Sequence, residues 1–67
     1  MTLKEAKAYM ISNPGTKFIC QVFHDEWIMY DAEKNKFVFE DGYEPDVYWW
    51  LTATSWDYDW WILDEHR

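Results

Sequence analysis

Apolar residues near the start of the chain recur every three or four positions, which is typical of an amphipathic helix. Leu3, Ala6 and Met10 follow this spacing. Thr2 and Glu5 match a capping box, in which two side chains satisfy backbone amides that are free at a helix start. The Ser-Asn-Pro-Gly stretch that follows should end the helix, because proline disfavours a helical residue before it and glycine permits a left-handed turn.

Runs of branched and aromatic residues that alternate with polar ones come next, and they predict an antiparallel sheet. The predicted strands cover residues 17–23, 26–31, 36–40 and 58–63. In the first of them, Phe18, Cys20 and Val22 should share one face. We expect a turn at His24-Asp25, and a second turn in the Ala-Glu-Lys-Asn stretch, whose asparagine can take a positive φ.

A second, shorter helix is predicted before the last strand. Proline is tolerated in a first helical turn, where its missing N–H is not needed, so Glu44-Pro45-Asp46 can start a helix over 47–51. The polar stretch 52–55 should end it. The predicted fold class is therefore α+β, with an N-terminal helix packed on an antiparallel sheet of about four strands and a short second helix before the last strand. We expect residues 1–67 to form a single domain.

Aromatic burial should supply most of the stability of so short a chain. The sequence holds 6 Trp, 5 Tyr and 4 Phe among its 67 residues, and each ring can remove roughly 150–250 Å² from water. Cys20 is the single cysteine, which excludes an internal disulfide and favours a reducing compartment. The chain shows neither a signal peptide nor a window apolar enough to span a membrane, so we expect a cytoplasmic protein.

The net charge of −7 arises entirely in the second half of the chain. Residues 1–36 carry five acidic and five basic side chains, which cancel, whereas residues 37–67 carry eight acids against Arg67 alone. The same half holds five of the six tryptophans. Nucleic acids and anionic membranes reward lysine and arginine, so this balance disfavours direct binding to either.

No motif in the sequence indicates catalysis or a bound metal. His24-Asp25-Glu26 has suitable residue types for a metal site, but three consecutive side chains cannot converge on one ion. Carboxylate pairs such as Asp57 and Asp59 would need a cleft to act as acid and base, and a domain of this size offers little cleft. We therefore predict a protein that is not an enzyme and that needs no cofactor or metal.

Acidic residues interspersed with tryptophans predict a binding surface for something basic. Aromatic side chains supply contact area in protein interfaces, while carboxylates can imitate the charge of a nucleic acid backbone. The alternative is that most tryptophans lie in the core and the acids only keep the chain soluble. The candidate partner-binding residues are Glu40, Asp41, Glu44, Asp46, Trp49, Trp50, Asp57, Asp59, Trp60 and Trp61.

Small size, acidity, abundant tryptophan and the absence of a catalytic motif make the chain resemble small phage-encoded counter-defence inhibitors, the anti-CRISPR and DNA-mimic proteins. That resemblance implies a non-enzymatic inhibitor in the host cytoplasm. The chain also resembles the Thoeris anti-defence proteins, in the order of a helix from Glu5-Ala6 onward, a strand with Trp27 and a closing strand Asp59-Trp60-Trp61-Ile62. This second resemblance implies capture of a cyclic nucleotide signal.

Two functions from different classes follow from these features. The leading hypothesis is an inhibitor that binds a basic, nucleic-acid-binding surface of a host protein, with a homodimer through exposed aromatics as a further expectation. The alternative is a module that binds or sequesters a small nucleotide or cationic ligand in an aromatic pocket. That pocket would be built from Trp27, Trp49, Trp50, Trp60 and Trp61.

The tryptophans should divide between folding and binding. Trp27 shares a strand face with Met29, so we assign it to the core. Two further pairs of tryptophans are adjacent in the sequence, one in the predicted second helix and one in the last strand. Neighbours in a strand point to opposite faces, and neighbours in a helix lie about 100° apart, so one member of each pair should be largely exposed.

Overall fold

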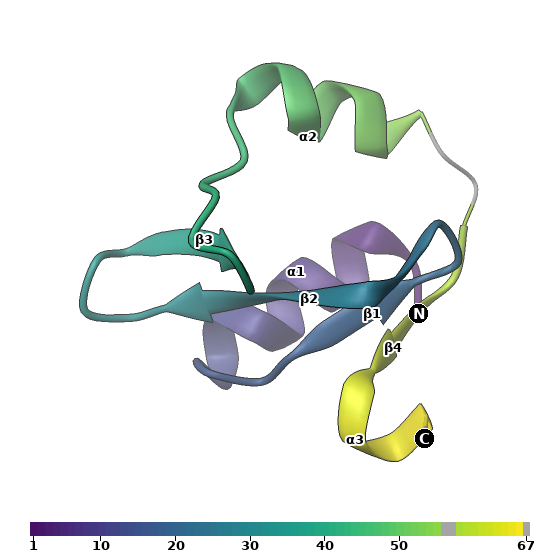
Figure 1. The fold of residues 1–67 in the computed structure, drawn as a ribbon, viewed down its shortest axis with the longest axis horizontal. Helices are drawn as coiled ribbons and strands as arrows, with labels where there is room; N and C mark the ends of the chain where they lie inside the picture. The colour runs from purple at the N-terminus through teal and green to yellow at the C-terminus, as the bar shows by residue number, and fades with distance from the viewer. Residues whose placement is uncertain (56–57, 67) are drawn as a thin grey trace.

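The computed structural model describes residues 1–55 and 58–66, apart from the side chains of His24, Glu65 and His66. Three helices and four strands make up this part of the chain (Figure 1). In chain order they are α1 (Leu3–Ser12), β1 (Phe18–Cys20), β2 (Phe23–Asp31), β3 (Lys36–Phe39), α2 (Val47–Thr54), β4 (Trp60–Ile62) and α3 (Leu63–His66). The predicted α+β fold class is confirmed, with α1 first and α2 before the last strand.

The four strands form one antiparallel sheet in the order β3-β2-β1-β4. Phe18 of β1 lies opposite Ile28 of β2 and Ile62 of β4, and Ile28 lies opposite Phe39 of β3. Residues that face each other across antiparallel strands point to the same side of the sheet. These four side chains therefore define one apolar face that crosses all four strands.

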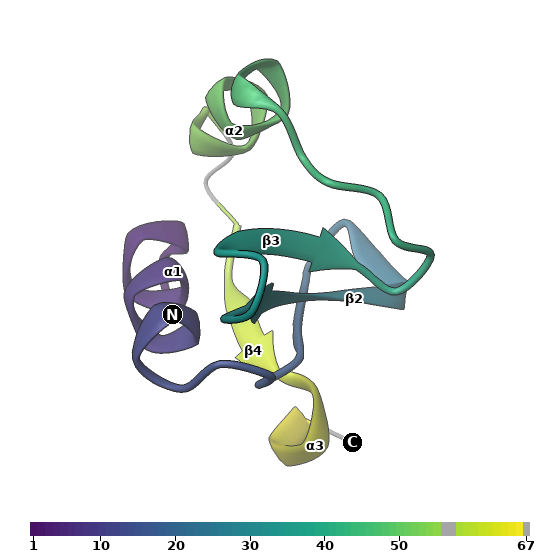
Figure 2. The same ribbon diagram turned by 90° about the vertical axis from the view of Figure 1, so that its left-hand side faces the viewer.

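Helix α1 lies along this apolar face, whereas α2 lies beyond the β3 edge of the sheet (Figures 1 and 2). Ala6 and Met10 of α1 are fully buried against the sheet. The predicted capping box is present, because Glu5 N–H donates to Thr2 Oγ1 and Thr2 N–H donates to Glu5 Oε1. The core cluster comprises Ala6, Met10, Phe18, Cys20, Ile28, Phe39 and Trp60.

The first predicted hairpin turn was placed too late. The turn falls at residues 21–22, and β2 already begins at Phe23, so His24-Asp25 lies within a strand. The register between β1 and β2 shifts between Phe18 and Cys20, as a β-bulge produces. Because of the turn, Val22 is exposed and Phe23 packs against the core, although strict alternation along 17–23 predicted the reverse. The positive φ of Asn35 in the next turn is confirmed.

Helix α2 is longer than predicted, since it continues to Thr54 instead of ending after residue 51. Asp46, not proline, begins it: its Oδ1 accepts the Trp49 N–H at 2.9 Å as an N-cap. Thr52 and Thr54 donate their hydroxyls to backbone carbonyls one turn earlier. Threonine can satisfy its hydroxyl inside a helix in this way, so the polar stretch does not interrupt α2.

The last strand is shorter than predicted, and a final helical turn follows it. β4 pairs with β1 through Trp60, Trp61 and Ile62, and α3 begins at Leu63, the last residue of the predicted strand. Trp60 also exchanges two backbone hydrogen bonds with Met1, at 2.8 and 2.9 Å, on its other side. The start of the chain thus pairs with β4 on the side away from β1.

Candidate functional site

Helix α2 has two apolar faces, and they differ sharply in exposure. Its residues 49, 50 and 53 point inward, where Ala53 is buried and both tryptophans are half-buried. Val47, Tyr48 and Leu51 point outward and are 64%, 75% and 65% exposed. At 100° per residue these two sets lie on opposite sides of the helix. The outward face is therefore apolar without contributing to the core.

The inward tryptophans attach α2 to the sheet by ring contacts. The Trp49 ring lies 5.2 Å from the Phe39 ring, and the Trp50 ring lies 5.0 Å from the Phe37 ring, both edge-on. The two indoles also contact each other edge-on at 4.9 Å. Lys7 of α1 places its Nζ 4.1 Å from the centre of the Trp50 ring, a cation–π contact. Both tryptophans thus hold α2 in place.

Trp60 is a core residue and not part of an exposed surface. It is 1% exposed and is among the largest fully buried side chains, with its ring 5.3 Å from that of Phe23. Its neighbour Trp61 points to the opposite face of the sheet and is half-buried. The prediction that one member of each tryptophan pair is largely exposed is wrong, because packing covers at least part of all four rings.

The assignment of Trp27 to the core is also wrong. Ile28 is fully buried on the α1 side of β2, so Trp27 and Met29 point to the other face, where both are half-buried. Lys17 Nζ lies over the Trp27 ring at 4.7 Å. Because Trp27 and Trp61 lie on this face and the other three tryptophans on the α1 side, the five rings do not line a common pocket.

The carboxylates predicted to bind a partner gather mainly in the loop before α2. Glu40, Asp41, Glu44 and Asp46 are all exposed. Three of them have fixed positions: Asp41 Oδ1 accepts the Tyr43 N–H at 3.0 Å, Asp46 caps α2, and Glu44 Oε1 lies 3.1 Å from Lys36 Nζ. These interactions place three exposed carboxylates between the end of β3 and the start of α2.

The other two predicted acids do not join this group. Asp59 is exposed, but it precedes β4, at the other edge of the sheet from β3. Asp57 lies outside the described residues. We define the acidic α2 surface as Glu40, Asp41, Tyr43, Glu44, Asp46, Val47, Tyr48 and Leu51.

Half of the acidic α2 surface was not among the sequence-based candidates. Sequence reasoning missed Tyr43, Val47, Tyr48 and Leu51 because the neighbouring tryptophans are the side chains most enriched in interfaces. A signal was present: if Asp46 is taken as the N-cap, helical spacing alone separates 47, 48 and 51 from 49, 50 and 53. Trp49 and Trp50, which have the larger rings, then belong to the set that points inward.

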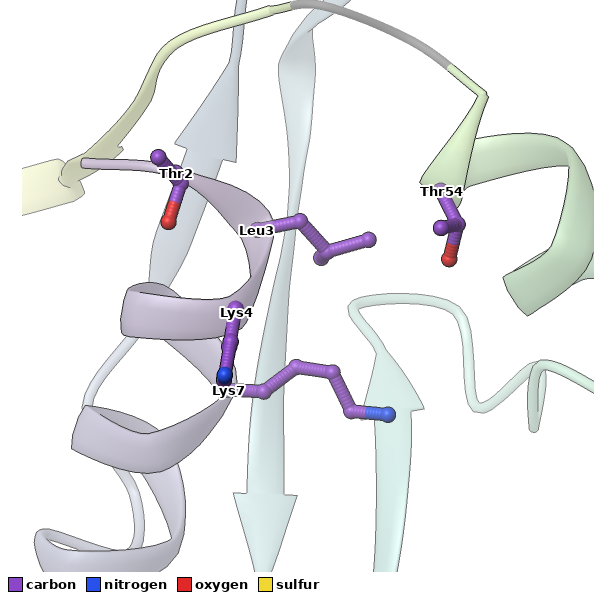
Figure 3. Close-up of a pocket in the computed structure, with 5 residues that line it drawn as sticks. All are labelled: Thr2, Leu3, Lys4, Lys7 and Thr54. Carbon is purple, nitrogen blue, oxygen red and sulfur yellow. The ribbon is translucent and has the colours of Figure 1, made fainter.

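Two open cavities lie at the two ends of α2. The first, of about 390 Å³, lies between the start of α1 and the end of α2 and contains two lysines (Figure 3). It is lined by Thr2, Leu3, Lys4, Lys7 and Thr54. The second, of about 380 Å³, lies between β3 and the loop that enters α2. It is lined by Lys36, Phe37, Glu44, Pro45, Asp46 and Trp50.

Chemically reactive groups are scarce in the described part of the chain. Cys20 is buried, and burial raises the pKa of its thiol, which keeps the thiol protonated and unreactive. Among the residues that the structure describes, no three His, Cys, Asp or Glu side chains converge as metal ligands would. The described helices include none with the length and apolarity to cross a membrane.

Comparisons with known proteins give no match. No family model matches the chain, and the searches of curated proteins and of solved structures likewise found nothing similar enough to report. The acidic α2 surface and the two cavities are therefore the features that bear on function.

Proposed function

We propose that this protein is a non-enzymatic binding protein that attaches through its acidic α2 surface to a basic, nucleic-acid-binding surface of another protein. One observation carries the proposal: α2 presents Val47, Tyr48 and Leu51 to solvent directly after a loop of exposed carboxylates. A helix with apolar side chains on its solvent side is not explained by folding. Exposed apolar patches with a polar rim are typical of protein interaction sites.

The apolar side chains would supply most of the binding energy. Tyrosine is enriched among the residues that dominate interface energetics, because its ring buries a large area and its hydroxyl can still find a partner. Tyr48 is the most exposed of the large apolar side chains in the described residues. We expect it to fill a pocket on the partner, with Leu51 beside it.

The carboxylates would select the partner and speed its approach. A net charge of −7 on 67 residues creates a field that attracts basic proteins over long distances and repels nucleic acid. Carboxylates spaced along the loop can occupy the sites where a basic surface would hold phosphates. Such a protein would compete with DNA or RNA for the same surface.

The resemblance to phage counter-defence inhibitors suggests which partners to test first. An inhibitor of this kind would bind a bacterial defence protein or complex that handles nucleic acid, in the host cytoplasm. Composition alone supports the identity of the partner, so a different partner would leave the proposed binding surface unchanged. A homodimer through the outward face of α2 is a second way to cover the same side chains.

Affinity capture from bacterial lysate, followed by competition, tests the proposal. The expected result is recovery of a nucleic-acid-binding protein whose complex with the chain weakens steeply as salt rises. Duplex DNA or RNA that the recovered protein binds should displace the chain in proportion to its concentration. A complex that is insensitive to salt and persists in excess nucleic acid would contradict the mimicry.

The cavity with two lysines is the observation that favours the alternative function, binding of a small ligand. Lys4 and Lys7 line it without any carboxylate among its described lining residues, which suits an anionic molecule such as a nucleotide. Tryptophan fluorescence would report such binding, because Lys7 contacts the Trp50 ring. Unchanged emission with nucleotides and cyclic dinucleotides would eliminate the alternative.

A further inference from the structure

The cavity between β3 and the start of α2 combines aromatic walls with carboxylates. Phe37 and Trp50 form its apolar wall, with their rings edge-on at 5.0 Å and 68°. Glu44 and Asp46 stand at its polar side. Both carboxylates also belong to the acidic α2 surface, so this cavity opens within the proposed interface.

The aromatic wall already attracts a cation in the folded protein. Lys7 Nζ lies 4.1 Å from the centre of the Trp50 ring and 5.5 Å from that of the Phe37 ring. Lys7 lines the other cavity and not this one. Lys7 therefore contacts both rings of the wall without lining the cavity, and the part of the Trp50 ring that does line it can attract a second cation.

The carboxylates are placed to receive a cation as well. Glu44 Oε1 holds Lys36 Nζ at 3.1 Å, and the two side chains are 44% and 57% exposed. An ion pair this exposed is weak because water screens it, so an incoming charge can replace it at little cost. Asp46 uses Oδ1 for the N-cap, and a carboxylate has further lone pairs on both oxygens.

We propose that this cavity accepts the guanidinium group of an arginine side chain from the basic partner. The proposal rests on the proposed function and deepens it by naming the chemistry of the group that enters. Arginine fits better than lysine because its planar group can stack on Trp50 and donate to two carboxylates at once, whereas an ammonium acts as a point charge. Lys36 forms an ion pair with Glu44 until the arginine binds, and its side chain then turns to solvent.

The test uses a small probe and does not need the partner. Nα-acetyl-arginine amide is titrated into the isotopically labelled chain, and the indole N–H signal of Trp50 is followed by NMR, with Nα-acetyl-lysine amide as the matched probe. We expect saturable shifts at Trp50 and Phe37 with arginine, and binding at least severalfold weaker with lysine. Equal shifts from the two probes, or no shift with either, would overturn the proposal.

Variants separate the cavity from general acidity. Glu44→Gln should weaken arginine binding severalfold, and Lys36→Met should tighten it about two- to fivefold by removing the internal competitor. Glu33→Gln, at an exposed acid in the turn before β3, is the matched control and should leave binding unchanged. An equal loss in Glu33→Gln and Glu44→Gln would mean that only net charge matters, which contradicts a built site.

The outcomes for the cavity and for the proposed function remain distinguishable. If the arginine probe binds at Trp50 but Tyr48→Ala leaves capture of the protein partner intact, the cavity stands and the interface assignment falls. If the probe fails while Tyr48→Ala abolishes capture, the interface stands and the arginine proposal falls. Circular dichroism on each variant confirms that it is folded.

Discussion

The two main helices of this protein are held in different ways. α1 packs directly on the sheet through Ala6 and Met10, which are fully buried, and half of its exposed residues are polar or charged. α2 lies beyond the β3 edge, reaches the core through Trp49 and Trp50, and leaves its outward face apolar. Helix α1 therefore contributes to the core, whereas α2 is attached to the core by two side chains and exposes its other face to solvent.

This difference explains why tryptophans are abundant near α2. A helix that lies beyond the edge of a sheet needs large side chains to reach the core. Indole is the largest of them, and a tryptophan side chain has only two torsion angles to fix. The tryptophans thus allow α2 to stand away from the sheet. The side chains available for binding are the smaller ones on its other side.

The largest effect on stability is expected where α1 and the sheet meet. Trp60→Ala should lower the free energy of unfolding by about 3–5 kcal/mol, which is the usual cost of removing a fully buried ring. Trp27→Ala, on the half-buried opposite face, should cost clearly less. Urea unfolding followed by circular dichroism measures both, and an equal loss in the two variants would contradict the assignment of faces.

A neighbouring pair of substitutions compares the two faces of α2. Trp49→Ala should lower the free energy of unfolding by about 2 kcal/mol. This is about half the loss expected for a fully buried ring, because the Trp49 indole is half-buried. Tyr48→Ala should change stability by less than about 0.5 kcal/mol, as surface substitutions usually do. Thermal melts of the two variants decide the point. If Tyr48→Ala destabilises as much as Trp49→Ala, the outward face is structural.

A smaller effect is expected at the start of α2. Asp46→Ala removes the N-cap and should cost about 1 kcal/mol, whereas Asp46→Asn keeps an oxygen that can accept the Trp49 N–H and should be nearly neutral. Chemical unfolding of both variants measures the difference. Because Asp46→Asn removes charge without removing the cap, any loss of partner binding in that variant belongs to electrostatics. Equal destabilisation by the two substitutions would argue against the cap.

The smallest effect is a pH dependence at the start of α1. The hydrogen bond from the Thr2 amide, and secondarily that with the Thr2 side chain, hold the pKa of Glu5 below its ordinary value of 4.5. A lowered folded-state pKa stabilises the protein above 4.5, and this contribution is lost as pH falls through the folded pKa. The stability difference between wild type and Glu5→Gln should therefore shrink on acidification. A constant difference would contradict the lowered pKa of Glu5.

Local patterns predicted the elements of the fold better than their ends. The capping box at Thr2 and Glu5 and the turn at Asn35 depend on neighbouring residues alone, and both are present. The predicted end of α2 was wrong because the Thr52 hydroxyl donates to a backbone carbonyl one turn earlier. Helix propensities do not take this hydrogen bond into account. The early start of β2 depends on a register shift between strands, which no single segment contains.

The candidate site divides in the same way. The exposed carboxylates from Glu40 to Asp46 were predicted from composition, because charged groups seldom enter a core. Which tryptophans are buried could not be predicted, because Trp49 and Trp60 contact Phe23 only after the sheet assembles. The same holds for the contact of Trp50 with Phe37. Tyr48 and Leu51 become candidates only when that packing is known.

The most direct test of the account is the affinity of the captured partner for three forms of the chain. These are wild type, the double variant Tyr48→Ala/Leu51→Ala, and Ile11→Ala, which removes a 51% exposed side chain from α1. Isothermal titration should show a loss of roughly 2 kcal/mol or more for the double variant, with its melting temperature unchanged, and no loss for Ile11→Ala. Wild-type affinity in the folded double variant would contradict the claim that α2 presents the binding surface.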